Sequence, residues 1–237
     1  EGLLEKEARE LNRGFFSRIE KNRPFITAKM ATGLDGGIAL ASGESKWITS
    51  EISRKDVHKL RATNEAILTG TGTILKDNPT LTSRDSEYDR NEVMQPLRVV
   101  IDRNHSLTGK ENIFSSEAKT LVFTTQGSRL KSNNAEICVM TKQDLNDLNL
   151  IMEYLANEKF INTLLVESGS EIYDALLTNK LIDEFILYQA PKLLGKGRKT
   201  FSKFGETNQK LSTIDFEINT ITNLGQDKKI ILTPNYK

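Results

Sequence analysis

The chain has 237 residues, with 33 Lys and Arg against 32 Asp and Glu, which leaves a formal net charge of +1. This balance gives no electrostatic reason to expect a nucleic-acid partner, and no apolar stretch approaches the roughly 20 residues that span a bilayer. A single cysteine, Cys138, excludes an intramolecular disulfide framework and a cysteine-rich zinc site, and a lone thiol suits the reducing cytoplasm. We expect Cys138 to be a small buried hydrophobe in the apolar run 137–140.

The first 22 residues carry apolar side chains at spacings of three and four, which predicts one amphipathic helix that Pro24 ends. Beyond it, short apolar runs typical of strands alternate with helical patterns. Helices are predicted at 50–62, from about 144 with Asp144 as N-cap, and at 171–178. Strands are predicted at 25–31, 66–69, 97–101, 120–124, 137–140, 163–166 and 184–189.

The last segment, 211–232, predicts two antiparallel strands around a turn at 223–227. Strands that alternate with helices indicate an α/β fold with a largely parallel sheet, here with an antiparallel C-terminal edge. Residues 82–96 are polar and are expected to form a surface excursion within one domain.

Three segments rich in Gly and small hydroxyl residues adjoin apolar runs, at 33–37, 70–73 and 167–170. Ligands of α/β proteins collect where strands end and helices begin. In the third segment a strand delivers Glu167, and a helix follows, so amides near Gly169 and Ser170 could hold a phosphate. A simple tight turn with an N-cap explains the same residues, and the GxGxxG spacing of dinucleotide sites is absent. The segment 70–73 is a weaker signal, since Gly-Thr turns are common.

Other chemistry-bearing side chains are few. His58 is expected to be partly exposed on a helix and His105 lies in a polar turn, so neither is assigned to catalysis. The chain has no zinc-protease, EF-hand or Ser-His-acid pattern, and no metal site is predicted. Arg61 lies one helical turn after Val57 and could reach an anion from the sheet edge, although a snorkelling surface arginine is the alternative.

Seven ordered segments closely resemble the reductase domain of the bifunctional riboflavin-biosynthesis deaminase/reductase, over nearly the whole chain. They are RPFITAKMA from Arg23, LDG from Leu34, SGESKWITS from Ser42, DVHKLRATNEAILTGTGTILKDNPTLTSR from Asp56, VVIDRN from Val99, LLVESGSEIYDALL from Leu164 and LIDEFILYQAPKLLGKG from Leu181. The resemblance implies a dihydrofolate-reductase-like α/β fold, with a mostly parallel sheet flanked by helices, and a homodimer. It also implies NADPH-dependent reduction of 5-amino-6-(5-phosphoribosylamino)uracil at ribose C1′ to the ribitylamino product.

The same resemblance implies the site residues. Lys29 is expected at the reacting centre, where its ammonium would hydrogen-bond ribose oxygens and assist proton transfer, and Glu167 is expected to hold the substrate. The implied substrate-binding residues are Ser45, Arg61, Leu81, Arg84 and Glu167. The implied cofactor-binding residues are Ala31, Trp47, Thr73 and Asp77 near the nicotinamide half, Arg103 near the adenosine 2′-phosphate, and Gly169, Ser170, Glu171, Ile172, Tyr173, Asp174 and Ala175 at the pyrophosphate.

Two positions depart from the family pattern: Gly37 stands where Lys or Arg is usual, and Ser168 where Gly is usual. Residues 1–22 resemble the linker that joins the deaminase to the reductase, so we expect a helical linker at 1–22 and a reductase domain at 23–237. The deaminase's His-x-Glu and Pro-Cys-x-x-Cys zinc signature has no counterpart in the sequence.

The chain is therefore expected to be the reductase half of a longer polypeptide with a fused deaminase domain. Two other functions stay open. One is a pterin-type or other small-molecule reductase on the same fold, and the other is a non-catalytic nucleotide-binding or oligomerisation domain.

Overall fold

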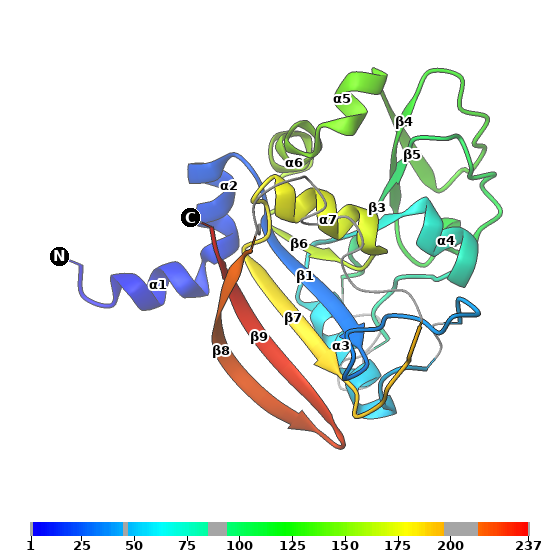
Figure 1. Cartoon of the computed structure of the whole chain (residues 1–237). Coiled ribbons are helices and arrows are strands. Elements are labelled where there is room, and N and C mark those ends of the chain that lie inside the picture. The colour runs from blue at the N-terminus through cyan, green and yellow to red at the C-terminus, as the bar shows by residue number, and fades with distance from the viewer. Residues whose placement is uncertain (1, 45–46, 85–93, 197–212, 237) are drawn as a thin grey trace.

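A single nine-stranded sheet organises the protein in a computed structural model that describes residues 2–44, 47–84, 94–196 and 213–236 (Figure 1). Across the sheet the strand order is β5-β4-β3-β2-β6-β1-β7-β9-β8. The strands are β1 (Phe25–Thr32), β2 (Ala66–Gly70), β3 (Leu97–Asp102), β4 (Thr120–Thr125), β5 (Ala135–Met140), β6 (Thr163–Val166), β7 (Glu184–Gln189), β8 (Asp215–Leu224) and β9 (Asp227–Asn235).

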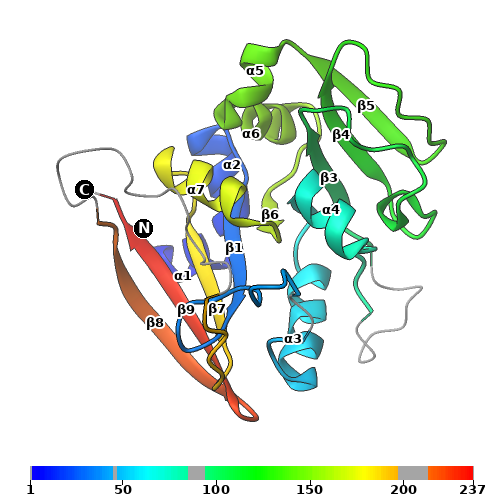
Figure 2. The same ribbon diagram turned by 45° about the vertical axis from the view of Figure 1, so that its right-hand side comes forward.

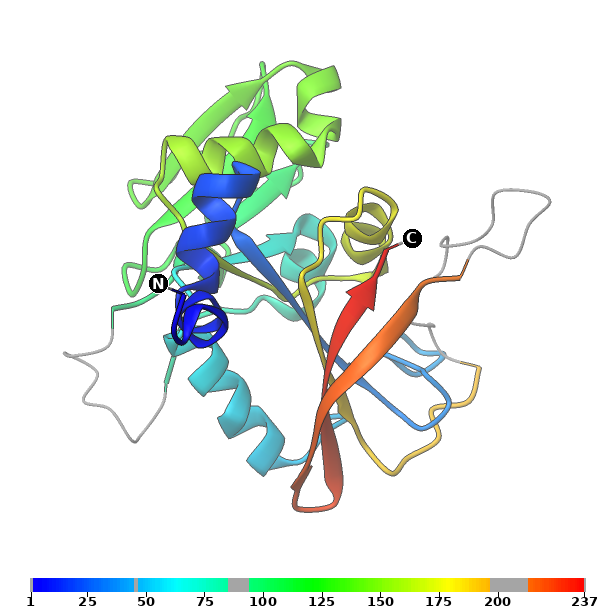
Figure 3. The ribbon, with the colours of Figure 1, turned by 90° about the vertical axis from the view of Figure 1, so that its left-hand side faces the viewer.

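The pairing confirms the predicted fold class. Strands β1 to β7 pair in parallel, whereas β9 runs antiparallel to both β7 and β8. Figure 3 shows β8 and β9 as a long twisted hairpin at one edge of the sheet. Strand β1 lies between β6 and β7, with Ala28 opposite Val166 and Lys29 opposite Ile186. The centre of the sheet thus joins segments that are far apart in the sequence.

Helices cover both faces of the sheet because the strands are apolar on both sides. Buried side chains of α6 and α7 share one core cluster with alternate residues of β1, β3 and β6, such as Ala28 and Val166. On the opposite face, Ile74 of α4 and Val57 of α3 belong to two smaller clusters. The ribbons of these two helices are labelled in Figure 2. The helices are α1 (Glu5–Leu11), α2 (Arg13–Lys21), α3 (Glu51–Ala62), α4 (Thr71–Asp77), the 3-10 helix η1 (Asn112–Phe114), α5 (Lys142–Asn146), α6 (Leu148–Asn157) and α7 (Ser170–Thr178).

The N-terminal segment differs from the predicted single helix. It forms two short helices, because Asn12 leaves the helical conformation at φ −108° and ψ 24°. The apolar side chains of α1 are exposed, Leu11 at 85%, while α2 buries Gly14 and Ser17 against the rest of the protein. In Figure 1, α1 projects away from the sheet.

Two other local predictions were wrong. The helix expected from about residue 144 begins earlier and is interrupted: Thr141 caps α5 and Asp147 caps α6, while Asp144 lies inside the first turn of α5. Cys138 is only half-buried, because β5 is an edge strand with one face partly open to solvent. Among the described residues, no helix has the length and apolarity needed to cross a membrane.

Candidate active site

Three charged side chains meet beside the carboxyl end of β6: Lys29 from β1, Arg61 from α3, and Glu167, which directly follows β6. Arg61 donates from Nε to Glu167 Oε1 at 2.6 Å and from Nη2 to Oε2 at 3.0 Å. Lys29 Nζ lies 3.6 Å from Glu167 Oε2. The three side chains are between 10% and 17% exposed. A largely buried cluster with two cations and one anion therefore lies where α/β sheets bind ligands.

The surroundings lower the pKa values of both Lys29 and Glu167. Burial lowers the pKa of the Lys29 ammonium, and Glu167 only partly offsets this effect. Burial alone would raise the pKa of the Glu167 carboxyl, but Arg61 and Lys29 hold it at about 2. Glu167 is consequently ionised at neutral pH, whereas Lys29 releases its proton more readily than an exposed lysine does. This combination suits an acid–base lysine held beside a permanent anion.

Tyr173 holds the backbone on which Lys29 and Glu167 stand. Its hydroxyl lies 2.5 Å from the carbonyl oxygen of Lys29 and 3.0 Å from that of Val166, and it accepts a hydrogen bond from the Ser168 amide. Only 2% of Tyr173 is exposed. It therefore connects β1, β6 and α7 and fixes the backbone on both sides of Glu167.

The predicted substrate-binding residues have different environments. The Arg61 guanidinium pairs with Glu167 of the same chain, so it is neither an isolated surface arginine nor a free anion site, and Arg61 Nη1 also donates to the Thr82 carbonyl at 3.1 Å. Leu81 is 3% exposed and its side chain belongs to a core cluster; its backbone is left-handed, at φ 49°. Arg84 is exposed. Ser45 lies outside the described residues.

His58 is a site neighbour that the sequence did not reveal. Its Nδ1 accepts a hydrogen bond from the Arg84 amide at 3.2 Å, and its carbonyl accepts one from the Ser83 hydroxyl. Burial lowers the pKa of His58, as do the nearby Arg61 and Arg84. The helical spacing of His58 and Arg61 was the available signal. Thr82 and Ser83 are buried, so this part of the predicted excursion is anchored to α3.

The start of α7 offers an open backbone surface. Gly169, the N-cap residue, is extended and exposed, and a Cβ there would meet no described atom within 4 Å. Helix N-termini of this kind bind phosphate groups. Among the predicted pyrophosphate residues, Ser170, Glu171 and Ala175 are at least partly exposed. The side chains of Ile172, Tyr173 and Asp174 are instead buried, at 6%, 2% and 7% exposure, and anchor the helix.

Arg103 lies near this surface. It directly follows β3 and is exposed. Partial burial of the guanidinium lowers the pKa of Arg103 while Glu171 opposes the change, which makes the two side chains neighbours. A cation is thus present beside the first turn of α7, where the resemblance implies the adenosine 2′-phosphate.

The residues predicted near the nicotinamide lie on three segments. Ala31 is half-buried near the end of β1, and Thr73 and Asp77 are half-buried on α4. Segment 70–73 thus begins a helix rather than ending in a simple turn. Trp47 is 65% exposed, and the Arg54 guanidinium lies 4.3 Å from the centroid of its ring.

The two departures from the family pattern fit the local structure. Ser168 has no positive φ, so a side chain is tolerated there without backbone strain. At Gly37 a Cβ would lie 3.0 Å from the Leu194 Cβ, which explains why the smallest residue suits this loop.

Asp35 joins the loop after β1 to the loop after β7, which lie side by side in Figure 1. Its Oδ2 accepts from the Leu194 and Gly195 amides at 3.0 and 2.7 Å, and its Oδ1 accepts from the Gly37 amide at 3.3 Å. The hydrogen bonds lower the pKa of this carboxyl against the opposing effect of burial. The LDG segment therefore fixes the rim of the site through its aspartate.

Replacing Asp35 by alanine should release those three amides together. We expect hydrogen exchange at Gly37, Leu194 and Gly195 to become at least about tenfold faster, since each loses a charge-assisted bond. Amides of β4 provide the internal reference, and Asp35→Asn, which keeps one carbonyl acceptor, should give an intermediate rate. Unchanged exchange at all three amides in the alanine variant would show that Asp35 does not hold the loops.

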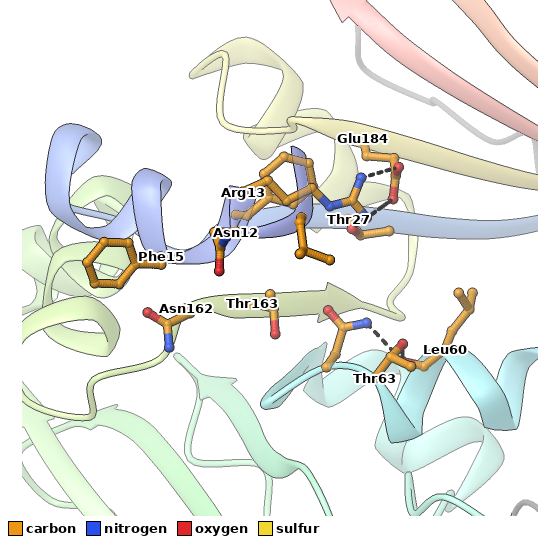
Figure 4. Close-up of a pocket in the computed structure, with 13 residues that line it drawn as sticks. Asn12, Arg13, Phe15, Thr27, Leu60, Thr63, Asn162, Thr163 and Glu184 are labelled. Atoms are coloured by element: carbon orange, nitrogen blue, oxygen red, sulfur yellow. Dashed lines mark hydrogen bonds and ion pairs between the residues drawn. The ribbon is translucent and has the colours of Figure 1, made fainter. Parts of the chain in front are cut away.

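A separate cavity of about 340 Å³ lies at the opposite, amino end of the central strands (Figure 4). Arg13 crosses it and donates to both carboxylate oxygens of Glu184 at 2.8 and 3.2 Å, and the Thr27 hydroxyl also bonds Glu184. Of the predicted site residues that the structure describes, none lines this cavity. The bonds among Arg13, Thr27 and Glu184 connect α2 to the sheet, and this cavity is distinct from the charged cluster.

The parallel sheet, its antiparallel C-terminal hairpin and the charged cluster between β1, β6 and α3 define a dihydrofolate-reductase-like α/β protein. The family model described as the RibD C-terminal domain matches residues 24–230, and the chain belongs to this family.

Similar proteins carry names from one pathway. "Riboflavin biosynthesis protein RibD" of Escherichia coli is 34% identical over 95% of this chain, which spans 64% of that protein. The "5-amino-6-(5-phosphoribosylamino)uracil reductase" of Buchnera aphidicola subsp. Acyrthosiphon pisum is 32% identical over 82% of this chain, which spans 99% of it. A crystal structure of the Thermotoga maritima deaminase/reductase is 31% identical, with a TM-score of 0.86 over 99% of this chain and 63% of that protein.

Proposed function

We propose that the chain reduces 5-amino-6-(5-phosphoribosylamino)uracil at ribose C1′ with NADPH, giving the ribitylamino product. The observation that carries this proposal is the buried cluster of Lys29, Arg61 and Glu167 next to the open start of α7. The similar Buchnera protein is named for this reductase activity, and the chain spans almost all of it. The charged cluster and this similarity both concern the reductase domain.

The chain's own residues would handle protons and orientation. Opening the ribosylamine ring to an imine requires a proton on the leaving ring oxygen, and Lys29 is the group that can donate it. Glu167 would hold the ammonium in place and stay ionised throughout. Arg84 is exposed and would bind the substrate phosphate, since three Arg61 donors are already engaged within the chain. Ser45 and Leu81 complete the proposed substrate site, Leu81 through its backbone beside Thr82, because its side chain is buried.

The residues present fit a dinucleotide. The open backbone at Gly169 would take the pyrophosphate, Arg103 the 2′-phosphate, and Ala31, Trp47, Thr73 and Asp77 the nicotinamide half. The reduced nicotinamide, when bound, supplies a hydride. The buried Ile172, Tyr173 and Asp174 would act by holding α7 in place.

Arg103 offers a test of the cofactor. In Arg103→Gln we expect the KM for NADPH to rise about tenfold or more while the KM for NADH changes little, because one charge-assisted bond to the 2′-phosphate is lost. Steady-state kinetics with both cofactors measures the ratio. Arg129→Gln, at an exposed position in a different loop, is the matched control. An equal change for both cofactors would exclude the 2′-phosphate role.

The activity itself is tested by loss of nicotinamide absorbance that depends on the phosphoribosylaminouracil. The substrate also separates this function from a pterin-type reductase, because Arg84→Ala should raise the KM of a phosphorylated substrate only. Oxidation of NADPH with pterins but not with the phosphoribosylaminouracil would overturn the proposal.

The proposal extends to the setting of the enzyme. The chain spans 64% of the Escherichia coli relative, which supports fusion to a deaminase domain in the full-length protein through residues 1–22. The exposed apolar side chains of α1 are consistent with such a linker. We place the enzyme in the cytoplasm as a homodimer, and light scattering of the purified chain tests the dimer.

A further inference from the structure

Three further side chains form a connected group behind Lys29: Asp56 on α3, Tyr188 on β7 and Lys229 on β9. Tyr188 donates its hydroxyl to Asp56 Oδ2 at 2.5 Å, and Lys229 Nζ donates to the same oxygen at 2.7 Å. Tyr188 is fully buried, while Asp56 and Lys229 are 22% and 16% exposed. The carboxylate is therefore shared between a phenol and an ammonium in a largely buried environment.

This group contacts the charged cluster through the tyrosine ring. In the sheet, Tyr188 lies opposite Ala31 of β1 on one side and Lys229 of β9 on the other. Lys29 Nζ lies 5.9 Å from the centroid of the ring, and Lys229 Nζ lies 5.8 Å from it. Both distances permit cation–π attraction. One aromatic ring thus separates two ammonium groups.

Lys29 needs such support because its ionic contact is loose. At 3.6 Å from Glu167 it is farther away than Arg61, whose short paired bonds occupy both carboxylate oxygens. The ring of Tyr188 forms the other wall of the lysine site. Burial raises the pKa of the Tyr188 phenol, and the bond to Asp56 raises it further, so the hydroxyl remains a donor.

We propose that Asp56, acting through Tyr188 and against Lys229, positions the Lys29 ammonium and balances the charge around it. The proposal rests on the function given above, in which Lys29 is the proton donor, and it makes Asp56, Tyr188 and Lys229 positioning residues. Within the described parts of the chain, the charged and titratable side chains beside Lys29 are Glu167, Arg61 and Tyr188.

The charges predict opposite effects at Lys29. Asp56→Asn keeps an oxygen that can accept the Tyr188 hydroxyl but leaves the Lys229 charge uncompensated, so Lys29 should lose its proton at lower pH. Lys229→Met removes the cation and leaves the Asp56 anion, so Lys29 should lose its proton at higher pH. Each shift should be about 0.5–1 pH unit, because the changed charge and Lys29 are both largely buried and lie on either side of the Tyr188 ring. The double variant should return close to the wild type.

Two measurements on the full chain test these signs. The first is the pH at which the Lys29 ¹³Cε resonance titrates in ¹³C-lysine-labelled protein, assigned by its loss in Lys29→Arg. The second is the basic limb of the kcat–pH profile with NADPH and the phosphoribosylaminouracil. Tyr188→Phe provides an uncharged comparison, in which we expect kcat to fall about tenfold, KM to stay within about twofold, and the basic limb to stay in place.

Opposite shifts in the two charge variants, cancelled in the double variant, support the proposal. Shifts of the same sign, an unmoved Lys29 resonance, or a Tyr188→Phe variant with the wild-type kcat overturn it. The proposed function fails separately: a wild-type chain without turnover, but with opposite resonance shifts, would refute the reductase activity and retain the charge balance at Lys29.

Discussion

Lys29→Met is expected to lower kcat by about 10²–10⁴-fold, the usual loss when a positioned acid–base group is removed. The reason is that burial lowers the pKa of the Lys29 ammonium, so Lys29 can give up a proton beside Glu167, while Arg61 stays charged. Methionine keeps the apolar stem and fills similar space. Single-turnover oxidation of bound NADPH measures the effect without product release.

The binding of NADPH should change little in this variant, and its affinity is the first check that the site is intact. Lys142→Met, at an exposed lysine of α5, is the matched control and should keep wild-type kcat. If Lys29→Met turned over at the wild-type rate, Lys29 would have no part in proton transfer.

Arg61→Leu is expected to destabilise the protein by about 3–5 kcal/mol at pH 7, because it leaves Glu167 as a buried charge with only the loose Lys29 contact. Urea unfolding followed by circular dichroism measures this loss. Arg9→Leu is the matched control, since Arg9 pairs with Glu20 at 2.8 Å where both side chains are about half exposed, and we expect little change there.

The pH dependence of this loss has a definite sign. The folded-state pKa of Glu167, about 2, is below its unfolded value of roughly 4.3. The ion pair therefore stabilises the protein fully above the unfolded pKa, and this stabilisation is lost as the pH falls toward 2. Without Arg61 the folded pKa rises, and protonation then relieves the buried charge at a higher pH. The stability gap between wild type and Arg61→Leu should therefore narrow from pH 7 to pH 4. An equal gap at both values would show that the loss does not come from Glu167.

Much of the fold could be predicted because the strands of a doubly covered parallel sheet are short apolar runs. The runs at 97–101 and 163–166 became β3 and β6, and the turn at 223–227 joins β8 to β9. The errors arose where local side-chain bonds decide the structure. Thr141 competes with Asp144 for the cap of α5, and periodicity alone does not show that Asn12 interrupts the first helix.

The site was less accessible from the residues alone. Glu167 at a strand end and Arg61 beside an apolar helix face were visible as patterns, whereas Lys29 entered through the resemblance. The group of Asp56, Tyr188 and Lys229 left no signal in the sequence, because its members come from a helix and two strands that only the sheet order brings together. The pattern of the sequence predicts helices and strands, but contacts between elements that are distant in the sequence become visible only in the folded structure.

Transfer of deuterium tests the central claim most directly, namely that hydride is delivered to ribose C1′ beside Lys29 and Glu167. The wild-type chain is supplied with the phosphoribosylaminouracil and with NADPH deuterated at the transferred position, and the product is analysed by NMR and mass spectrometry. We predict a ribitylamino product with one deuterium at C1′, formed far more slowly by Lys29→Met. Deuterium at another carbon, or NADPH oxidation without deuterium in the product, would contradict the account.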